Sequence, residues 1–369
     1  GARIMKKKAC FAIAVFMLIA ILLASGCGGS ETTPAENGGQ VSPDANSDEV
    51  ITVVFGSSVP PVVPQGQAFQ KWGDRIEELS QGRVKFEYYW NWALIPTLDE
   101  IPRGVAEGIC DVHSFFAQAN ITPLHYGLLY LPFMNWPSLE DTLEILKKLQ
   151  DKFPELREEY SNLGVKLYAT AVCPPGGWAF KNKEVRTPQD LEGIRFLAVG
   201  VGPTTDFIEL AGGIPMQVGF GDLYMALERG MGEGAESPSG AAHANGIIPL
   251  LPYNTMFGES GLRIGVCQLI MNNDFYNNLP SDIKQIFDDS VSYFEEVVVE
   301  AERQSLEVAI KEAEDLGHTI IWLTPEELKV WQDFAIPIHE KWIEEMEAQG
   351  KPARAIYEEA KRLIAEYNK

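Results

Sequence analysis

The chain has 369 residues, of which 46% are hydrophobic, and its formal net charge is −22 at pH 7. Charge of this size and sign excludes nucleic acid and anionic membrane surfaces as electrostatically favoured partners. It leaves a small ligand open, because a ligand in a pocket responds to its local surroundings more than to the net charge. Residues 50–369 are too many for one ordinary hydrophobic core and predict two domains.

The N-terminus carries the features of an export signal. Arg3 and the lysines at 6–8 form a basic head, residues 9–23 form an apolar run, and small residues precede Cys27. This layout predicts a lipoprotein signal peptide over residues 1–27, with lipid on Cys27 of the mature chain. An ordinary signal peptide and an uncleaved anchor are the alternatives, although the apolar run is short for a spanning helix, which needs about 20 residues.

Residues 28–49 are dominated by Gly, Ser, Thr, Pro, Asn, Asp and Glu, and Val41 is the only aliphatic side chain there that is larger than alanine. A segment of this composition buries too little apolar surface to fold. We expect it to be a flexible tether between the lipid and the folded body at 50–369.

The folded body begins with a pattern that predicts a βαβ unit. The β-branched run at 51–55 predicts a buried strand, apolar residues at helical spacing predict a helix over 67–79, and 84–90 returns to strand composition. Such a unit implies an α/β fold with a parallel sheet. The following elements are expected, in chain order, as a helix at 99–107, a strand at 111–116, a serine-capped helix at 138–148, a strand at 165–171, a short helix at 187–190, a strand at 194–198, helices at 204–210 and 222–228, and a buried strand at 261–271.

One predicted helix is unusually long. From Ser281 to Asp315 the pattern is helical, with no Gly or Pro, and about 35 residues at 1.5 Å each span roughly 50 Å. This length exceeds the diameter of one domain, so we expect the helix to brace two. Thr324 and Pro325 begin a further amphipathic helix, and helices continue to Tyr367.

Sequence motifs of enzymes are missing from the chain. It has no GxSxG, HExxH or Walker motif and no GxGxxG after a strand. The five histidines lack the spacing of metal ligands. We therefore expect no catalysis, no cofactor and no metal. For the cysteines of the folded body, Cys110, Cys173 and Cys267, we expect buried free thiols, with a single disulfide as the alternative.

Several short motifs occur in an order and spacing that resemble one protein family. They are Gly82-Arg83-Val84, 107–111, Leu131-Pro132-Phe133, 187–194, Pro215, Phe220, 224–230 and Glu236-Ser237-Pro238. Over 51–367 the chain resembles the DctP-like solute-binding proteins of tripartite ATP-independent periplasmic (TRAP) transporters. The resemblance implies two α/β lobes around a ligand cleft, crossed by the long helix. Lobe I would cover about 50–170 and lobe II about 171–275, with C-terminal helices at 281–369 bracing both.

The same resemblance identifies positions that face the ligand, and this chain lacks charge at several of them. Where the family grips an organic acid with an Arg, this chain has Leu197. Arg195 lies two residues earlier, about 6.6 Å away along a strand, so a displaced grip is an alternative. Where sialic-acid-binding members carry a second Arg and a Glu, this chain has Gly177, followed by Trp178, and Phe116.

The remaining family positions point the same way. Ser237 replaces the Asn that the family places before Pro, whereas Phe220 matches its pocket aromatic. A carboxylate buried against Leu197 without a cation would be strongly destabilised. We therefore hypothesise a ligand with an apolar, aromatic body that is held by burial and ring stacking. The expected ligand-binding residues are Ser58, Trp92, Phe115, Phe116, Gly177, Trp178, Leu197, Phe220 and Ser237, with Tyr88 and Trp90 as further aromatic candidates that core packing would explain equally.

The function implied by the resemblance is that of a lipid-anchored extracytoplasmic receptor. It would capture a small organic solute and deliver it to a TRAP-type membrane permease. Three alternatives remain at this point: a binder of a C4-type carboxylic acid that uses a displaced cation such as Arg195, a ligand-sensing lipoprotein, and a surface hydrolase.

Overall fold

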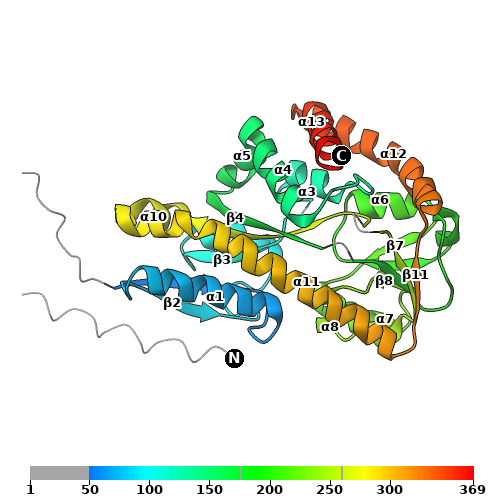
Figure 1. Ribbon diagram of the computed structural model, residues 1–369, viewed down its shortest axis with the longest axis horizontal. Coiled ribbons are helices and arrows are strands. Elements are labelled where there is room, and N and C mark those ends of the chain that lie inside the picture. The colour runs from blue at the N-terminus through cyan, green and yellow to red at the C-terminus, as the bar shows by residue number, and fades with distance from the viewer. Residues whose placement is uncertain (1–49, 118, 175, 259–260) are drawn as a thin grey trace, which may run out of the picture. The chain divides into compact units, whose positions relative to one another are not determined.

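The computed structural model describes residues 50–117, 119–174, 176–258 and 261–369. The predicted signal peptide, the tether and Cys27 lie outside the described residues. The described chain forms two β-sheets with helices around both (Figure 1). Within this part of the chain, no helix combines the length and the apolar character that crossing a membrane requires.

The first sheet has five strands in the order β2-β1-β3-β10-β4. Its strands are β1 (Ile51–Gly56), β2 (Val84–Tyr89), β3 (Val112–Phe115), β4 (Val165–Cys173) and β10 (Gly265–Asn272). Strand β1 pairs in parallel with β2 and β3, and α1 (Pro64–Leu79) connects β1 to β2, which confirms the predicted βαβ unit. Strand β10 runs antiparallel between β3 and β4, although it follows most of the second sheet in the sequence.

The helices of the first sheet bury aromatic and aliphatic side chains against it. Phe69 and Trp72 of α1 are fully buried against Phe55 of β1. The remaining helical segments of this part are η1 (Leu98–Glu100), α2 (Ile101–Ala106), α3 (Pro123–Tyr130), α4 (Leu139–Lys152), α5 (Glu155–Asn162), α9 (Asn273–Asn278) and α10 (Ser281–Asp289). Ser138 accepts a hydrogen bond from the Asp141 backbone N–H at 3.2 Å, so the predicted serine cap of α4 is confirmed.

The second sheet has six strands in the order β11-β9-β5-β8-β6-β7. Its strands are β5 (Trp178–Phe180), β6 (Arg195–Ala198), β7 (Ile214–Gln217), β8 (Gly234–Glu236), β9 (Tyr253–Met256) and β11 (Thr319–Trp322). The helical segments around it are η2 (Pro188–Leu191), α6 (Pro203–Leu210), η3 (Phe220–Asp222), α7 (Leu223–Glu228), α8 (Gly240–Ala244) and η4 (Ile248–Leu250). The helix predicted at 187–190 is thus one 3-10 turn, closed by the Thr187–Asp190 capping box.

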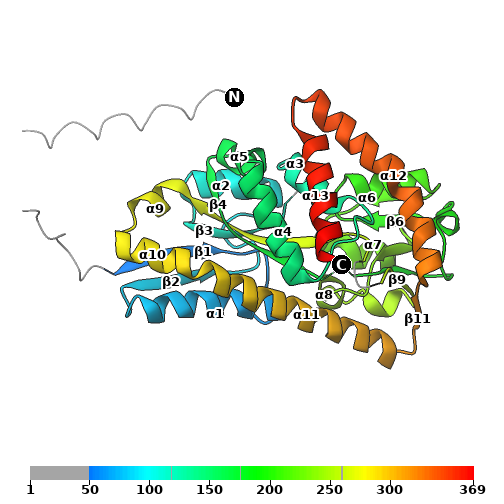
Figure 2. The same cartoon turned by 45° about the horizontal axis from the view of Figure 1, so that its top comes forward.

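The long helix predicted over 281–315 is present as two helices, α10 and α11 (Val291–Asp315). They separate at Ser290, whose Oγ receives a hydrogen bond from Trp72 Nε1 at 3.0 Å. Helix α11 contacts β4 and α1 of the first sheet as well as α8 and β11 of the second. In Figures 1 and 2 it runs beside both sheets, as expected for a brace.

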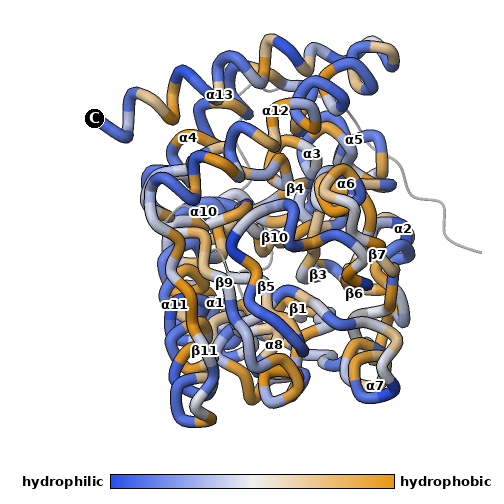
Figure 3. Tube along the Cα trace, turned by 90° about the vertical axis from the view of Figure 1, so that its right-hand side faces the viewer, coloured by the Kyte–Doolittle hydropathy of each residue, from blue (hydrophilic) through white to orange (hydrophobic). Residues whose placement is uncertain are grey.

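Two C-terminal helices complete the fold, α12 (Pro325–Ala348) and α13 (Ala353–Tyr367). Helix α12 contacts α6 beside the second sheet and α3 beside the first, and α13 packs on α4. Figure 3 shows blue and orange alternating along these helices, as expected for amphipathic elements with one buried side. Helices α11 and α12 therefore each contact elements of both halves of the fold.

Candidate functional site

Three of the predicted ligand-binding residues lie in hydrophobic cores. Phe115 is 0% exposed, and Trp178 and Leu197 are each 1% exposed. Trp178 lies in an aromatic cluster of the second sheet. Its ring centroid is 4.7 Å from that of Phe196 and 6.1 Å from that of Trp331. Packing explains all three side chains as they stand in this structure. Their contact with a solute stays a prediction.

The backbone at Gly177 has no room for a longer side chain. A Cβ there would lie 2.6 Å from the Thr255 carbonyl oxygen and 2.7 Å from Met256 Sδ. An Arg at this position is therefore incompatible with the observed backbone. The neighbouring Ser237 is fully buried, and its Oγ lacks a hydrogen-bond partner among the described residues.

The other predicted positions are less enclosed. Ser58, Trp92 and Phe116 are half-buried, and Trp92 adopts a φ of 65°. The Phe220 backbone lies in η3, and its side chain is not among the parts that the structure describes. The aromatic candidates Tyr88 and Trp90 stack on each other, with ring centroids 5.1 Å apart, as part of the aromatic packing around Phe55.

The cation at the junction of the two sheets is Arg263 rather than Arg195. Arg195 is 42% exposed and pairs with Glu233 at 3.4 Å on the surface. The Arg263 side chain is only 18% exposed and lies on the segment that leads from the second sheet into β10 of the first. This segment is fixed on both sides: the Phe133 backbone N–H donates to the Leu262 carbonyl at 2.6 Å, and Gly265 begins the pairing of β10 with β4.

Arg263 is held by a carboxylate and an aromatic ring. Its Nε donates to Glu236 Oε1 at 3.1 Å, and its Nη2 donates to Oε1 and Oε2 of Glu236 at 2.7 Å each. Glu236 is the last residue of β8 in the second sheet. The guanidinium carbon lies 3.9 Å from the ring centroid of Tyr130 on α3, which packs against the first sheet. We call Tyr126, Tyr130, Glu236 and Arg263 the junction cluster.

The two tyrosines of the junction cluster form one aromatic surface. Tyr126 and Tyr130 are four residues apart on α3 and therefore lie on the same helix face. Their ring centroids are 3.9 Å apart, with planes inclined by 21°. A Cβ on Gly202, in the loop before α6, would lie 2.9 Å from the Tyr126 ring, so this ring also touches the second sheet's side. The cluster thus joins both halves of the fold.

Buried polar contacts set the position of α3. The Glu159 carboxylate accepts hydrogen bonds from the backbone N–H groups of Leu124 and His125, each at 2.9 Å, at the first turn of this helix. Lys351, from the loop between α12 and α13, pairs with the same carboxylate. An anion at a helix N-terminus is favourable, because the first backbone N–H groups lack partners within the helix.

Electrostatics keep the guanidinium charged. Burial lowers the pKa of Arg263, but attraction by Glu236 outweighs it and holds the pKa above its ordinary value. Burial raises the pKa of the Tyr126 and Tyr130 hydroxyls, so both tyrosines remain neutral. The cluster therefore offers one cation, one anion and two neutral rings. A guanidinium of this kind is a planar receptor for a carboxylate.

Helix α11 adds a half-buried acid near this region. Burial raises the pKa of the Glu302 carboxyl to about 7. Burial and, to a smaller extent, the negative charge of Glu302 raise the pKa of the Cys173 and Cys267 thiols. Cys173 pairs in register with Gly265, two residues after Arg263. Cys110, Cys173 and Cys267 are all free thiols, as expected; Cys110 and Cys267 are also buried, whereas Cys173 is half-buried.

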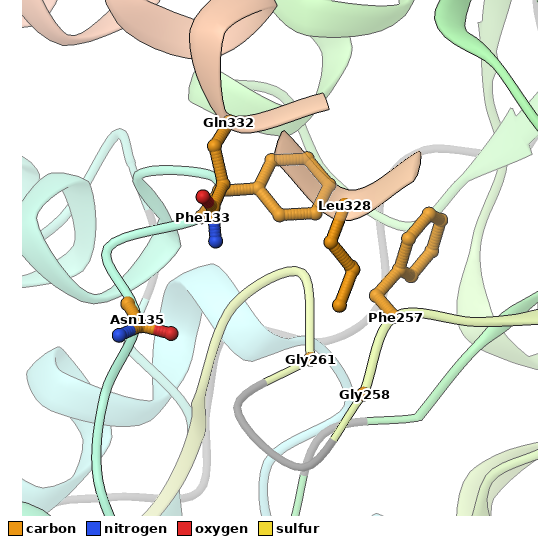
Figure 4. Close-up of a pocket in the computed structure, with 7 residues that line it drawn as sticks. All are labelled: Phe133, Asn135, Phe257, Gly258, Gly261, Leu328 and Gln332. Carbon is orange, nitrogen blue, oxygen red and sulfur yellow. The ribbon is translucent and has the colours of Figure 1, made fainter. Parts of the chain in front are cut away.

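A separate cavity of about 260 Å³ opens beside α12. Figure 4 shows its walls, with Phe133 and Phe257 on two sides and Leu328 between them. The remaining lining residues are Asn135, Gly258, Gly261 and Gln332. None of the four junction-cluster residues lines it, and its polar groups are amides without charge.

The junction cluster is absent from the residues predicted from sequence to bind the ligand. Glu236 belongs to one of the family motifs, but Arg263 stands alone between Leu262 and Ile264, near the start of the strand predicted over 261–271. An Arg between aliphatic residues at a strand start was the available signal. The tyrosine pair was signalled by its four-residue spacing within an otherwise apolar segment.

Comparison of the sequence with known proteins identifies the family of the chain. The sequence model of the bacterial extracellular solute-binding protein family 7, DctP, matches residues 55–345. The C4-dicarboxylate-binding periplasmic protein DctP of Rhodobacter capsulatus is 22% identical over 311 residues, which are 82% of this chain and 89% of that protein.

Solved structures share the fold. A TRAP solute-binding protein from Rhodoferax ferrireducens T118, in complex with copurified benzoate, superposes with a TM-score of 0.77 at 22% identity, covering 86% of this chain and 99% of that one. A marine metagenome TRAP solute-binding protein specific for aromatic acid ligands, in complex with 3-hydroxybenzoate, gives a TM-score of 0.78 at 23% identity, covering 87% and 100%. The two-lobed α/β fold with a long bracing helix is thereby confirmed. The chain belongs to family 7 of the bacterial extracellular solute-binding proteins, the DctP family of TRAP transporters.

Proposed function

We propose that this receptor captures a small organic solute with an aromatic body at the junction cluster and delivers it to a TRAP-type membrane permease. It would do so while tethered to the membrane by lipid on Cys27. The ligand's ring would pack against the edge of Tyr130, whose faces are covered by Tyr126 and Arg263, within reach of the Arg263 guanidinium.

One observation carries the choice of site. The Arg263 side chain is 18% exposed, lies on a segment between the two sheets, and touches Tyr130 from one side and Glu236 from the other. A ligand bound at such a place contacts both lobes at once. Because a ligand stabilises the closed arrangement only through contacts to both lobes, this position couples binding to closure.

The choice of an aromatic solute rests on the tyrosine pair. The ring edges of this pair suit edge-to-face contact with an aromatic ligand, and such contacts contribute beyond the area they bury. The two solved relatives with benzoate and 3-hydroxybenzoate support this class of ligand, since they share the fold over most of the chain. A dicarboxylate would find only one cation in the junction cluster, which leaves its second carboxylate without an ionic partner.

Thermal unfolding in the presence of candidate solutes tests the proposal. Benzoate, 3-hydroxybenzoate, indole-3-acetate, phenylalanine, benzamide and succinate would each be added to the purified protein. A ligand that binds the folded state raises the melting temperature as its concentration exceeds Kd. We expect the aromatic acids to give the largest shifts, and a loss of those shifts in Tyr130→Leu. Shifts confined to succinate would refute the aromatic assignment.

Membrane attachment needs its own test. Expressed in a bacterial host, the full chain is expected in the membrane fraction, and Cys27→Ser is expected to release the exported protein in soluble form. Equal membrane retention of both proteins would refute lipid anchoring at Cys27.

A further inference from the structure

Arg263 could bind the carboxylate of a solute, but in this structure it is already paired with the carboxylate of Glu236. Glu236 takes two of the three guanidinium nitrogens, Nε and Nη2, through three contacts of 2.7 to 3.1 Å. This is the geometry with which an arginine grips a free carboxylate. A solute carboxylate that seeks the same edge of Arg263 therefore meets a carboxylate of the protein itself.

The two partners of the pair differ in how firmly they are held. The Arg263 side chain is 18% exposed, whereas the Glu236 side chain is 42% exposed. The guanidinium is also fixed by the Tyr130 ring at 3.9 Å and by the paired backbone on both sides of its segment. Arg263 is thus the deep, fixed partner, and Glu236 reaches it from the solvent side. Since Glu236 is still partly hydrated, it is the partner that can return to water at low cost.

We propose that the Glu236 carboxylate is a built-in competitor, which occupies Arg263 until the carboxylate of an aromatic monoacid displaces it. This inference rests on the proposed function and names the ligand class within it. The exchange replaces one carboxylate with another, so the number of charge-assisted hydrogen bonds on Arg263 is conserved. The ligand's ring then adds edge-to-face contact with Tyr130 that Glu236 does not provide.

Specificity follows from the difference between the free energy that a solute gains at Arg263 and the tyrosines and the free energy lost when Glu236 leaves Arg263. A neutral aromatic solute has no group that replaces Glu236 on Arg263, and a carboxylate without a ring gains nothing over Glu236. Only a solute with both features binds more strongly than the internal carboxylate. The competition also lowers the affinity for the correct ligand, because displacing Glu236 takes part of the binding free energy.

Isothermal titration calorimetry of wild type and Glu236→Gln tests the proposal, with benzoate, benzamide and phenylalanine as probes. We expect Glu236→Gln to bind benzoate about two- to fivefold more tightly, since a partly exposed ion pair is worth about that factor. Benzamide binding is expected to stay unchanged. Glu233→Gln is the matched control, because it removes the carboxylate of an exposed Arg–Glu pair on the same sheet, and it is expected to leave benzoate affinity unaltered.

The outcomes separate the two proposals. Benzoate binding that is equal or weaker in Glu236→Gln than in wild type overturns the competitor while leaving the aromatic receptor intact. Weaker binding of phenylalanine in the variant identifies Glu236 as a direct contact to the ligand's ammonium group and also overturns it. No binding of any aromatic probe to either protein overturns both proposals. Thermal unfolding of Glu236→Gln checks its fold, and Glu236→Ser supplies a second neutral variant with the same expected gain.

Discussion

The contact between α3 and α12 gives a sharp test of the structure. A Cβ on Gly127 would lie 1.9 Å from Nε1 of Trp342, whereas ordinary contacts of a Cβ start at 3.4 Å. Gly127→Ala therefore forces the indole to move by about 1.5 Å. Trp342 is 4% exposed, and its Nε1 donates to the Pro123 carbonyl at 3.5 Å, so the ring has little space to move into.

Two effects of opposite sign act in this variant. Replacing Gly with Ala inside a helix is favourable by about 1 kcal/mol. Overpacking a well-filled core costs about 1–3 kcal/mol. Because the clash involves a rigid ring, we expect the cost to prevail, with a net loss of roughly 1–2 kcal/mol and a fall in Tm of roughly 2–5 °C. Affinity for aromatic acids should fall as well, since α3 carries Tyr126 and Tyr130.

Thermal unfolding followed by circular dichroism provides the measurement. Gly221→Ala is the control, because its added Cβ meets no atom within 4 Å, and it should be neutral or slightly stabilising. A Gly127→Ala protein as stable as wild type, or more stable, would refute the tight α3–α12 contact and with it the placement of the tyrosine pair.

Three further outcomes concern stability. Trp72→Phe removes the 3.0 Å hydrogen bond to Ser290 and leaves a void, so the free energy of unfolding in urea should fall by about 2–3 kcal/mol. Burial raises the pKa of Glu302 from 4.5 to about 7, so its ionised form destabilises the fold as pH rises through that window, and Glu302→Gln should raise Tm more at pH 8 than at pH 4. Burial lowers the pKa of His113 and His125 from 6.5 to about 4, so stability present above pH 6.5 should be lost as pH falls towards 4, and His125→Gln should make Tm less sensitive over that range.

The sequence predicted those elements whose signal is local. Helix α1 follows from apolar residues at helical spacing, and the capping residues Ser138 and Thr324 lie where the sequence places them. Short strands escaped prediction, because β5 and β8 have three residues each, too few for a period to show. The break at Ser290 was not predicted either; its hydroxyl bonds to the Phe287 carbonyl and to Trp72, which lies 218 residues away.

The candidate site was harder to predict, because its parts meet only in three dimensions. Arg263 pairs with Glu236, which lies 27 residues earlier in the chain, and contacts Tyr130 on a helix of the other half. No periodic pattern in the sequence indicates that these three residues are in contact. Family positions alone pointed to Leu197 and Trp178, and both are enclosed in cores here. Their apolar character was read correctly, whereas their role in binding stays a prediction.

The place of β10 in the first sheet has a consequence for biosynthesis. This strand supplies the middle pairing between β3 and β4, yet it ends only at Asn272. While the chain emerges from N- to C-terminus, β3 and β4 each keep an open edge until more than two thirds of the protein has been made. Unpaired strand edges invite association with other chains. Fragments ending before residue 265 should therefore aggregate rather than fold.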